Sequence, residues 1–193
     1  MKKVLIALLA VLLLLSFTSC EKDKSEDVIA AYEEFISVND ICSDAARMLN
    51  NAEVVKDNTV YDYYIVSLVK AINGIDIEIK SNKITSGSKD STSEGDVDTN
   101  TYSDVVIEYT YTEGSDTTEK TGTLTVSGTY VSESPNIRAQ AAYSDVSYEL
   151  TINGTKYKLS YYRDSYGKYE RASVNGKDVE VRLLNSSLDH EYA

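Results

Sequence analysis

The sequence predicts an α+β fold in which two N-terminal helices pack on an antiparallel meander sheet or open barrel of about six to eight strands. Apolar residues recur at three- and four-residue steps over residues 28–50 and 60–73, which is the helical period. From residue 75 onward, apolar and polar residues alternate, as in strands with one buried face. Asn-Gly pairs at 153–154 and 175–176 separate alternating runs and predict tight hairpins.

The first helix is predicted over residues 28–50. Its apolar stripe consists of Val28, Tyr32, Phe35, Cys42, Ala46 and Leu49. Asn39 interrupts this stripe, so a break near residues 37–40 is an alternative to one continuous helix.

The second helix is predicted over residues 60–73. Thr59 and Asp62 resemble a capping box, and Asn73 with Gly74 provides a stop signal. A strand is the competing interpretation, because residues 60–69 are rich in β-branched and aromatic side chains.

The strands are predicted from residue 75 onward, beginning with the alternation of Ile75, Ile77 and Ile79. Residues 81–101 are dominated by small polar side chains and predict a flexible loop or a frayed hairpin. Further strand regions are expected at 104–112, 118–131, 137–152, 156–162, 169–174 and 177–184, with Gly122 and Gly128 marking bulges or kinks. The single domain then spans residues 28–188, and residues 189–193 form a tail.

The N-terminal segment has the layout of a secretory signal. Lys2 and Lys3 precede an uninterrupted apolar run over residues 4–15, which is too short for a comfortable membrane span. After Cys20 the sequence becomes polar at once, and residues 20–27 are expected to form a solvated tether. An ordinary secretory signal with an incidental cysteine, and an uncleaved apolar anchor, are the alternatives.

Phe17, Thr18, Ser19 and Cys20 resemble the lipobox of bacterial lipoprotein precursors. Thr18 and Ser19 match the small residues of that pattern, whereas Phe17 stands where the pattern has an aliphatic residue. The resemblance implies cleavage after Ser19 and a diacylglyceryl thioether on Cys20, so residues 1–19 would be a signal peptide. It also favours the outer membrane in a cell with two membranes, because Glu21 is not the Asp that retention at the inner membrane uses.

Charge limits the class of partner. The chain of 193 residues has 31 acidic and 19 basic residues, giving a net charge of -12. Loss of Lys2 and Lys3 with the signal leaves 17 basic and 31 acidic residues, or -14. Nucleic acid would be repelled by this charge.

The residues that could support catalysis are few. Once Cys20 is acylated, Cys42 is the only remaining thiol, and the only histidine is His190 near the C-terminus. Zinc sites, Cys/His pairs and Ser/His/Asp triads are therefore not expected. Paired carboxylates of the glycosidase kind stay open, because Asp and Glu occur throughout the chain.

Two clusters are candidate ligand sites. Asp96, Asp98 and Asn100 place oxygen ligands at alternating positions and form a weak calcium candidate, although the Gly and Glu of an EF-hand loop are missing. The candidate for sugar or peptide binding is an aromatic and basic group made of Tyr161, Tyr162, Arg163, Tyr166, Tyr169 and Arg171. Plain strand packing is the competing interpretation of these tyrosines.

These observations predict a lipid-anchored, non-enzymatic protein of the bacterial envelope. Its tyrosine-rich, acidic, β-rich domain would bind or scaffold an envelope protein, peptide or glycan, and no cofactor is expected beyond the lipid on Cys20. The alternatives are a carrier of an apolar ligand in a barrel-like sheet and a carbohydrate-active enzyme with paired carboxylates.

Overall fold

The computed structural model describes residues 22–52, 58–133, 143–164 and 169–179, with the backbone alone at residues 22–26, 28, 143–144, 162–164 and 169–171. The described chain confirms the α+β class: it has two helices and one antiparallel sheet, which is open rather than closed into a barrel. The helices are α2 (Lys22–Asn51) and α3 (Asp62–Asn73). The strands are β1 (Ile77–Glu94), β2 (Val97–Glu113), β3 (Lys120–Glu133), β4 (Tyr143–Ile152), β5 (Thr155–Asp164), β6 (Tyr169–Val174) and β7 (Lys177–Val179).

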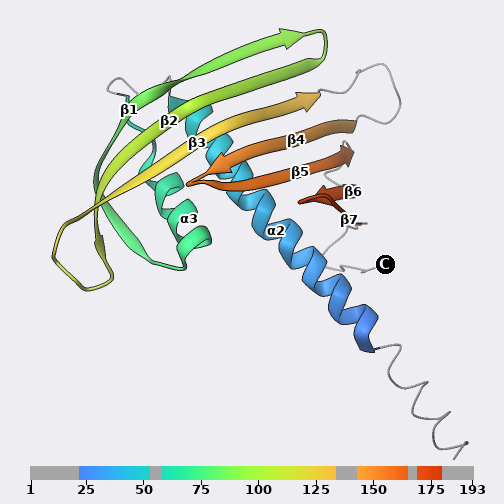
Figure 1. Cartoon of the computed structure of the whole chain (residues 1–193), viewed down its shortest axis with the longest axis horizontal. Helices are drawn as coiled ribbons and strands as arrows, with labels where there is room; N and C mark the ends of the chain where they lie inside the picture. The colour runs from blue at the N-terminus through green and yellow to red at the C-terminus, as the bar shows by residue number, and fades with distance from the viewer. Residues whose placement is uncertain (1–21, 53–57, 134–142, 165–168, 180–193) are drawn as a thin grey trace, which may run out of the picture.

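The seven strands lie in the sheet in their sequence order, so the predicted meander is confirmed. Figure 1 shows α2 running diagonally across one face of the sheet, with α3 beside it and the long strands β1 and β2 bending strongly. One hydrophobic core joins both helices to this face of the sheet. The opposite face, called the outer face here, carries mainly Ser, Thr and charged side chains on β2 to β5.

α2 is one continuous helix, so the alternative of a break near residues 37–40 is wrong. It begins at Lys22, and residues 22–27, expected in a tether, are therefore helical. The segment contains neither Gly nor Pro, which allows the helix to continue into a polar sequence. Its buried positions follow the predicted spacing and include Phe35, Val38, Cys42, Ala46 and Leu49.

α3 is a helix, as predicted over residues 60–73. Gly74 ends it in the left-handed conformation, φ 70°, and donates its N–H to the carbonyl of Lys70 at 2.8 Å. The N-terminus differs from the expected capping box, because Tyr61 is the N-cap residue and makes no side-chain capping bond. Asn82 of β1 instead fixes this end, accepting from Val60 N at 2.8 Å and donating to Asp62 Oδ1 at 2.7 Å.

The segment 81–101 is part of a long hairpin of β1 and β2, which corrects the expectation of a flexible loop. Its side chains are largely exposed on both faces, so the period-two signal of a half-buried strand is absent. Backbone pairing from Ser88–Ser103 to Glu94–Val97 extends the ladder to the turn at Gly95. The register shifts near Ile79, Ile84 and Ser86 mark irregularities along the edge strand β1.

Both predicted Asn-Gly hairpins are present. Asn153 and Gly154 join β4 to β5 with φ values of 48° and 80°, and Asn175 and Gly176 join β6 to β7 with 49° and 84°. Positive φ at both positions is what a type I′ turn requires. Residues 137–142 and 180–184, also expected in strands, and the tail 189–193 lie outside the described residues.

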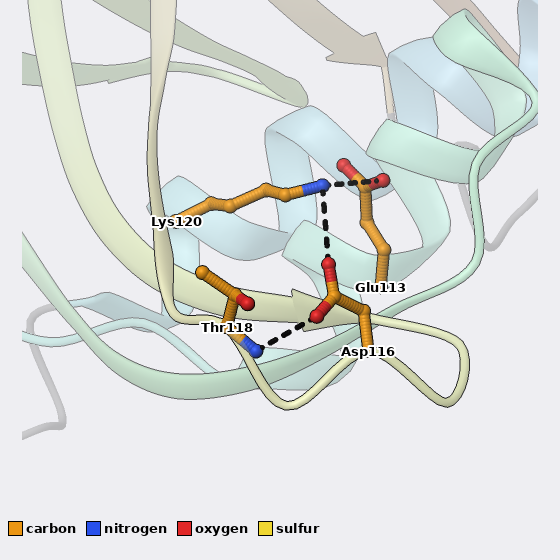
Figure 2. A network of polar contacts seen from close by, with 4 residues as sticks. All are labelled: Glu113, Asp116, Thr118 and Lys120. Atoms are coloured by element: carbon orange, nitrogen blue, oxygen red, sulfur yellow. Dashed lines mark hydrogen bonds and ion pairs between the residues drawn. The ribbon is translucent and has the colours of Figure 1, made fainter.

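The connection between β2 and β3 is held by a polar network, shown in Figure 2. Lys120 Nζ lies 2.9 Å from Glu113 Oε2, and Asp116 Oδ1 accepts a hydrogen bond from the Thr118 N–H at 3.0 Å. This backbone hydrogen bond lowers the pKa of Asp116, and the bond to Glu113 raises the pKa of Lys120. The network fixes the turn, although its side chains are solvent-exposed or nearly so.

Neither described helix is both long enough and apolar enough to cross a bilayer.

Candidate functional site

A hollow of about 860 Å³ lies on the sheet where β3 ends, β4 begins and the short strands β6 and β7 pair. It is lined by Val131, Glu133, Asp145, Val146, Ser147, Ser160, Tyr161, Ala172, Ser173, Asp178 and Val179. We refer to it as the sheet hollow.

The register explains how these residues come together. Val131 pairs with Ser147, Ser147 with Ser160, Ser160 with Ser173, and Ser173 with Asp178. Residues paired across an antiparallel ladder share one face, so this row lies on the outer face. Val146, Tyr161 and Ala172 belong to the opposite, buried face, as does Val179, which pairs with Ala172.

Apart from Val131, the outer side chains of the sheet hollow are small hydroxyls and carboxylates. Glu133 and Asp145 are directly opposite each other, which places their Cβ atoms about 4.5–5.5 Å apart. Asp178 adds a third carboxylate, and the described lining residues include no Lys or Arg. Such a surface can accept hydrogen bonds from hydroxyl and ammonium groups, which suits a polyhydroxylated or cationic ligand.

Tyr161, a predicted site residue, is buried rather than presented to a ligand. Its ring meets Phe35 of α2 edge-on, with centroids 6.0 Å apart and an interplanar angle of 81°. It also makes a side-chain hydrogen bond with Tyr148, whose pKa is raised above its ordinary range mainly by burial. Tyr161 therefore packs between sheet and helix, which is the competing interpretation of the tyrosine cluster.

The side chains of the other five members of the aromatic and basic cluster lie outside the described part of the structure. Tyr162 and Arg163 lie in β5, and Tyr169 and Arg171 lie in β6, where only the backbone is described. Tyr166 lies outside the described residues. Cys20 and Ser19, the predicted lipidation and cleavage residues, also lie outside them.

The weak calcium candidate maps to the tip of the β1–β2 hairpin. Asp96 is in the turn, whereas Asp98 and Asn100 are on β2. Asp98 accepts a hydrogen bond from Ser93, and Asn100 Oδ1 accepts one from Ser91 at 2.7 Å. In the described part of the chain, no three His, Cys, Asp or Glu residues gather in a group able to hold a metal ion.

Cys42 is fully buried on α2, and burial raises the pKa of its thiol to about 12. A thiol in this environment remains neutral at physiological pH and is a poor nucleophile. It behaves as a core side chain, as its helical spacing predicted.

No protein-family profile, curated protein or solved structure matches the chain.

The sequence indicated the tyrosines but missed the sheet hollow. The two Asn-Gly turns contained part of the signal, because two-residue loops imply the pairs Ser147–Ser160 and Ser173–Asp178. The connection between β5 and β6 carries no comparable signal. The alignment of the two pairs into one row was therefore not predictable.

Proposed function

We propose that this protein is a lipid-anchored lipoprotein of the bacterial envelope whose sheet serves as a non-catalytic binding module. The observation that carries the proposal is Cys20 at the end of the signal-like segment, preceded by Thr18 and Ser19. The start of α2 at Lys22 supports it, because the helix would then begin two residues after the modified Cys20. Two or three acyl chains on Cys20 would hold the protein durably at a membrane, whereas one chain gives marginal binding. Glu21 favours the outer membrane where two are present.

The sheet hollow is the proposed binding surface. Its hydroxyls and carboxylates can bind the polar groups of a glycan or of a basic segment of an envelope protein, and its valines can pack against the apolar parts of the same ligand. The inner face of the sheet is occupied by core side chains from α2 and α3, which argues against the alternative of an apolar carrier.

A carbohydrate-active enzyme is the second candidate, because Glu133 and Asp145 are paired directly across the ladder in the hollow, which brings two carboxylates together as glycosidases require. Both side chains are exposed. A general acid of that class needs apolar surroundings to remain protonated near neutral pH. Binding without catalysis is therefore the better-supported proposal.

The anchor is tested by intact mass and membrane partitioning of the full-length protein made in a bacterial host. The wild type is expected to lose residues 1–19, gain diacylglyceryl and acyl groups and float with membranes. Cys20→Ala should abolish the lipid mass and the membrane association. Cys42→Ala is the matched control, since it removes the other cysteine and should leave both readouts unchanged. An unlipidated wild type would contradict the proposal.

The binding surface is tested by comparing two arginine substitutions on the same face of the sheet. In Ser160→Arg the new side chain fills the hollow. Thr123 is an exposed residue of β3 outside the hollow, so Thr123→Arg leaves the hollow open. With soluble peptidoglycan fragments and a lysine-rich peptide as probes, Ser160→Arg should weaken binding at least tenfold and Thr123→Arg should not. Equal affinities of the two variants would exclude the hollow as the binding site. Release of sugar by the wild type that is lost in Glu133→Gln would instead support the carbohydrate-active enzyme.

A further inference from the structure

The N-terminal third of α2 lies outside the hydrophobic core. Among the side chains of α2 that the structure describes, Phe35 is the first that is buried, whereas Asp27, Ile29 and Ala30 are exposed, Ile29 to 47%. Figure 1 shows this end of α2 projecting well beyond the sheet. Tyr32 is the first residue of α2 that packs against the core, so residues 22–30 form a helical segment ahead of the core contacts that support the rest of α2.

Elementary helix physics explains why this segment stays helical. Extending an existing helix costs little compared with nucleating one, and the packed part of α2 provides the nucleus. Asp23, Glu26 and Asp27 carry negative charge near the N-terminal end, where the helix dipole favours it. At about 1.5 Å per residue, residues 22–30 span about 14 Å.

The direction in which the segment leaves the domain is fixed at its base. Glu34 Oε1 accepts a hydrogen bond from Asn175 Nδ2 at 3.2 Å, and Glu34 Oε2 lies 3.9 Å from Lys177 Nζ. One residue later, Phe35 packs against Tyr161. These contacts attach α2 to the β6–β7 turn and to β5. The helix therefore leaves the domain in a fixed direction rather than through a flexible hinge.

We propose that residues 22–30 form a rigid stalk that holds the sheet about 14 Å from the membrane surface in a fixed orientation. The stalk rests on the proposed lipidation of Cys20, which lies two residues before α2 begins. The stalk faces an anionic lipid surface. This surface would repel the mature chain, whose charge is -14, counted as 17 basic minus 31 acidic residues. Because the screening length is about 8 Å at physiological ionic strength, a spacing of about 14 Å removes most of that repulsion.

The stalk is tested with two spin labels on the full-length lipidated protein in liposomes. One label replaces Lys24 in the stalk, and the other replaces Thr123 on the outer face of β3. Cys20 is blocked by its lipid and Cys42 is buried, so neither native cysteine takes a label. The width of the distance distribution is compared among the otherwise native chain, Ala30→Pro and the control Ala30→Ser. Proline breaks a helix interior, whereas serine at this exposed position is tolerated.

The native chain and Ala30→Ser should give one narrow distribution, and Ala30→Pro should at least double its width. The melting temperature of the domain should stay the same in all three, because Ala30 lies outside the core. A native distribution as broad as that of Ala30→Pro, in a sample whose mass shows the lipid, would overturn the stalk and leave the anchor intact. A missing lipid mass would instead overturn the anchor and, with it, the placement at the membrane.

A second readout measures the height above the membrane. Deleting residues 24–30 removes about two helical turns and about 10 Å while nearly preserving the helix phase. Energy transfer from a dye at position 123 to headgroup-labelled lipids should rise in this deletion. Unchanged transfer would show that α2 does not set the spacing.

Discussion

Cys42 lies in the core beside Tyr148 and Tyr157, whose pKa values are both raised, mainly by burial. The same burial raises the pKa of the Cys42 thiol from its ordinary value of 9.0 to about 12. In the unfolded chain the thiol ionises from about pH 9, whereas in the folded protein it stays neutral. Its contribution to stability is therefore complete below pH 9 and is lost as the pH rises toward 12.

We predict that Cys42→Ala flattens the alkaline loss of stability. Between pH 9 and 10 the free energy of unfolding of the wild type should fall by about 1 kcal/mol more than that of the variant. Urea unfolding at pH 8, 9 and 10 measures this difference, and tyrosine ionisation cancels because it is common to both proteins. Parallel curves would show that the thiol is not shielded.

Gly128 determines how closely β3 approaches β4. It has φ 121°, and a Cβ atom added there would lie 2.0 Å from the carbonyl oxygen of Glu149. Gly154, in the β4–β5 turn, also has a positive φ of 80°, but a Cβ there would meet nothing within 4 Å. The two glycines therefore separate backbone strain from steric overlap.

We predict that Gly128→Ala destabilises the protein by about 3–5 kcal/mol, because strain and overpacking both apply. Gly154→Ala should cost about 1–2 kcal/mol, from strain alone. The midpoint of urea unfolding measures both values. Equal costs would show that β3 and β4 can separate to admit a methyl group.

How well each element could be predicted depended on whether its residues face a core. α3 and β4, which carries Leu150 and Ile152, each have one buried face, and their apolar period was visible in the sequence. The Asn-Gly turns were equally clear, because few residues adopt positive φ. Residues 81–101 form strands mainly through backbone pairing and exposed polar contacts, so Ser and Thr at these positions gave no periodic signal. The helical state of residues 22–27 comes from their covalent continuity with the packed part of α2, which a polar composition does not reveal.

At the scale of the molecule, the core is unevenly distributed. It gathers α2, α3 and the central strands, whereas most side chains of the distal β1–β2 hairpin, residues 88–100, are exposed on both faces. Local opening is cheapest where few apolar contacts are lost.

We predict that backbone amides in residues 88–100 exchange with solvent at least a hundredfold faster than those of Val126 and Leu150, which are almost fully buried. Hydrogen exchange followed by mass spectrometry on the folded protein provides the comparison, with the exposed β2–β3 turn as an internal reference for rapid exchange. Equal protection of the hairpin and the central strands would show that the sheet opens only as a whole.

The irregular register of β1 has a consequence for crowding. Chains anchored in one membrane, as proposed here, meet their neighbours at high local concentration, and a long straight edge strand would template their polymerisation side by side. The displaced pairs near Ile79, Ile84 and Ser86 interrupt the regular spacing of free N–H and C=O groups on that edge. Lys83 adds an exposed charge between them. β1 is the longest described strand of the sheet, yet its edge presents no continuous row of N–H and C=O groups with which a neighbouring copy could pair.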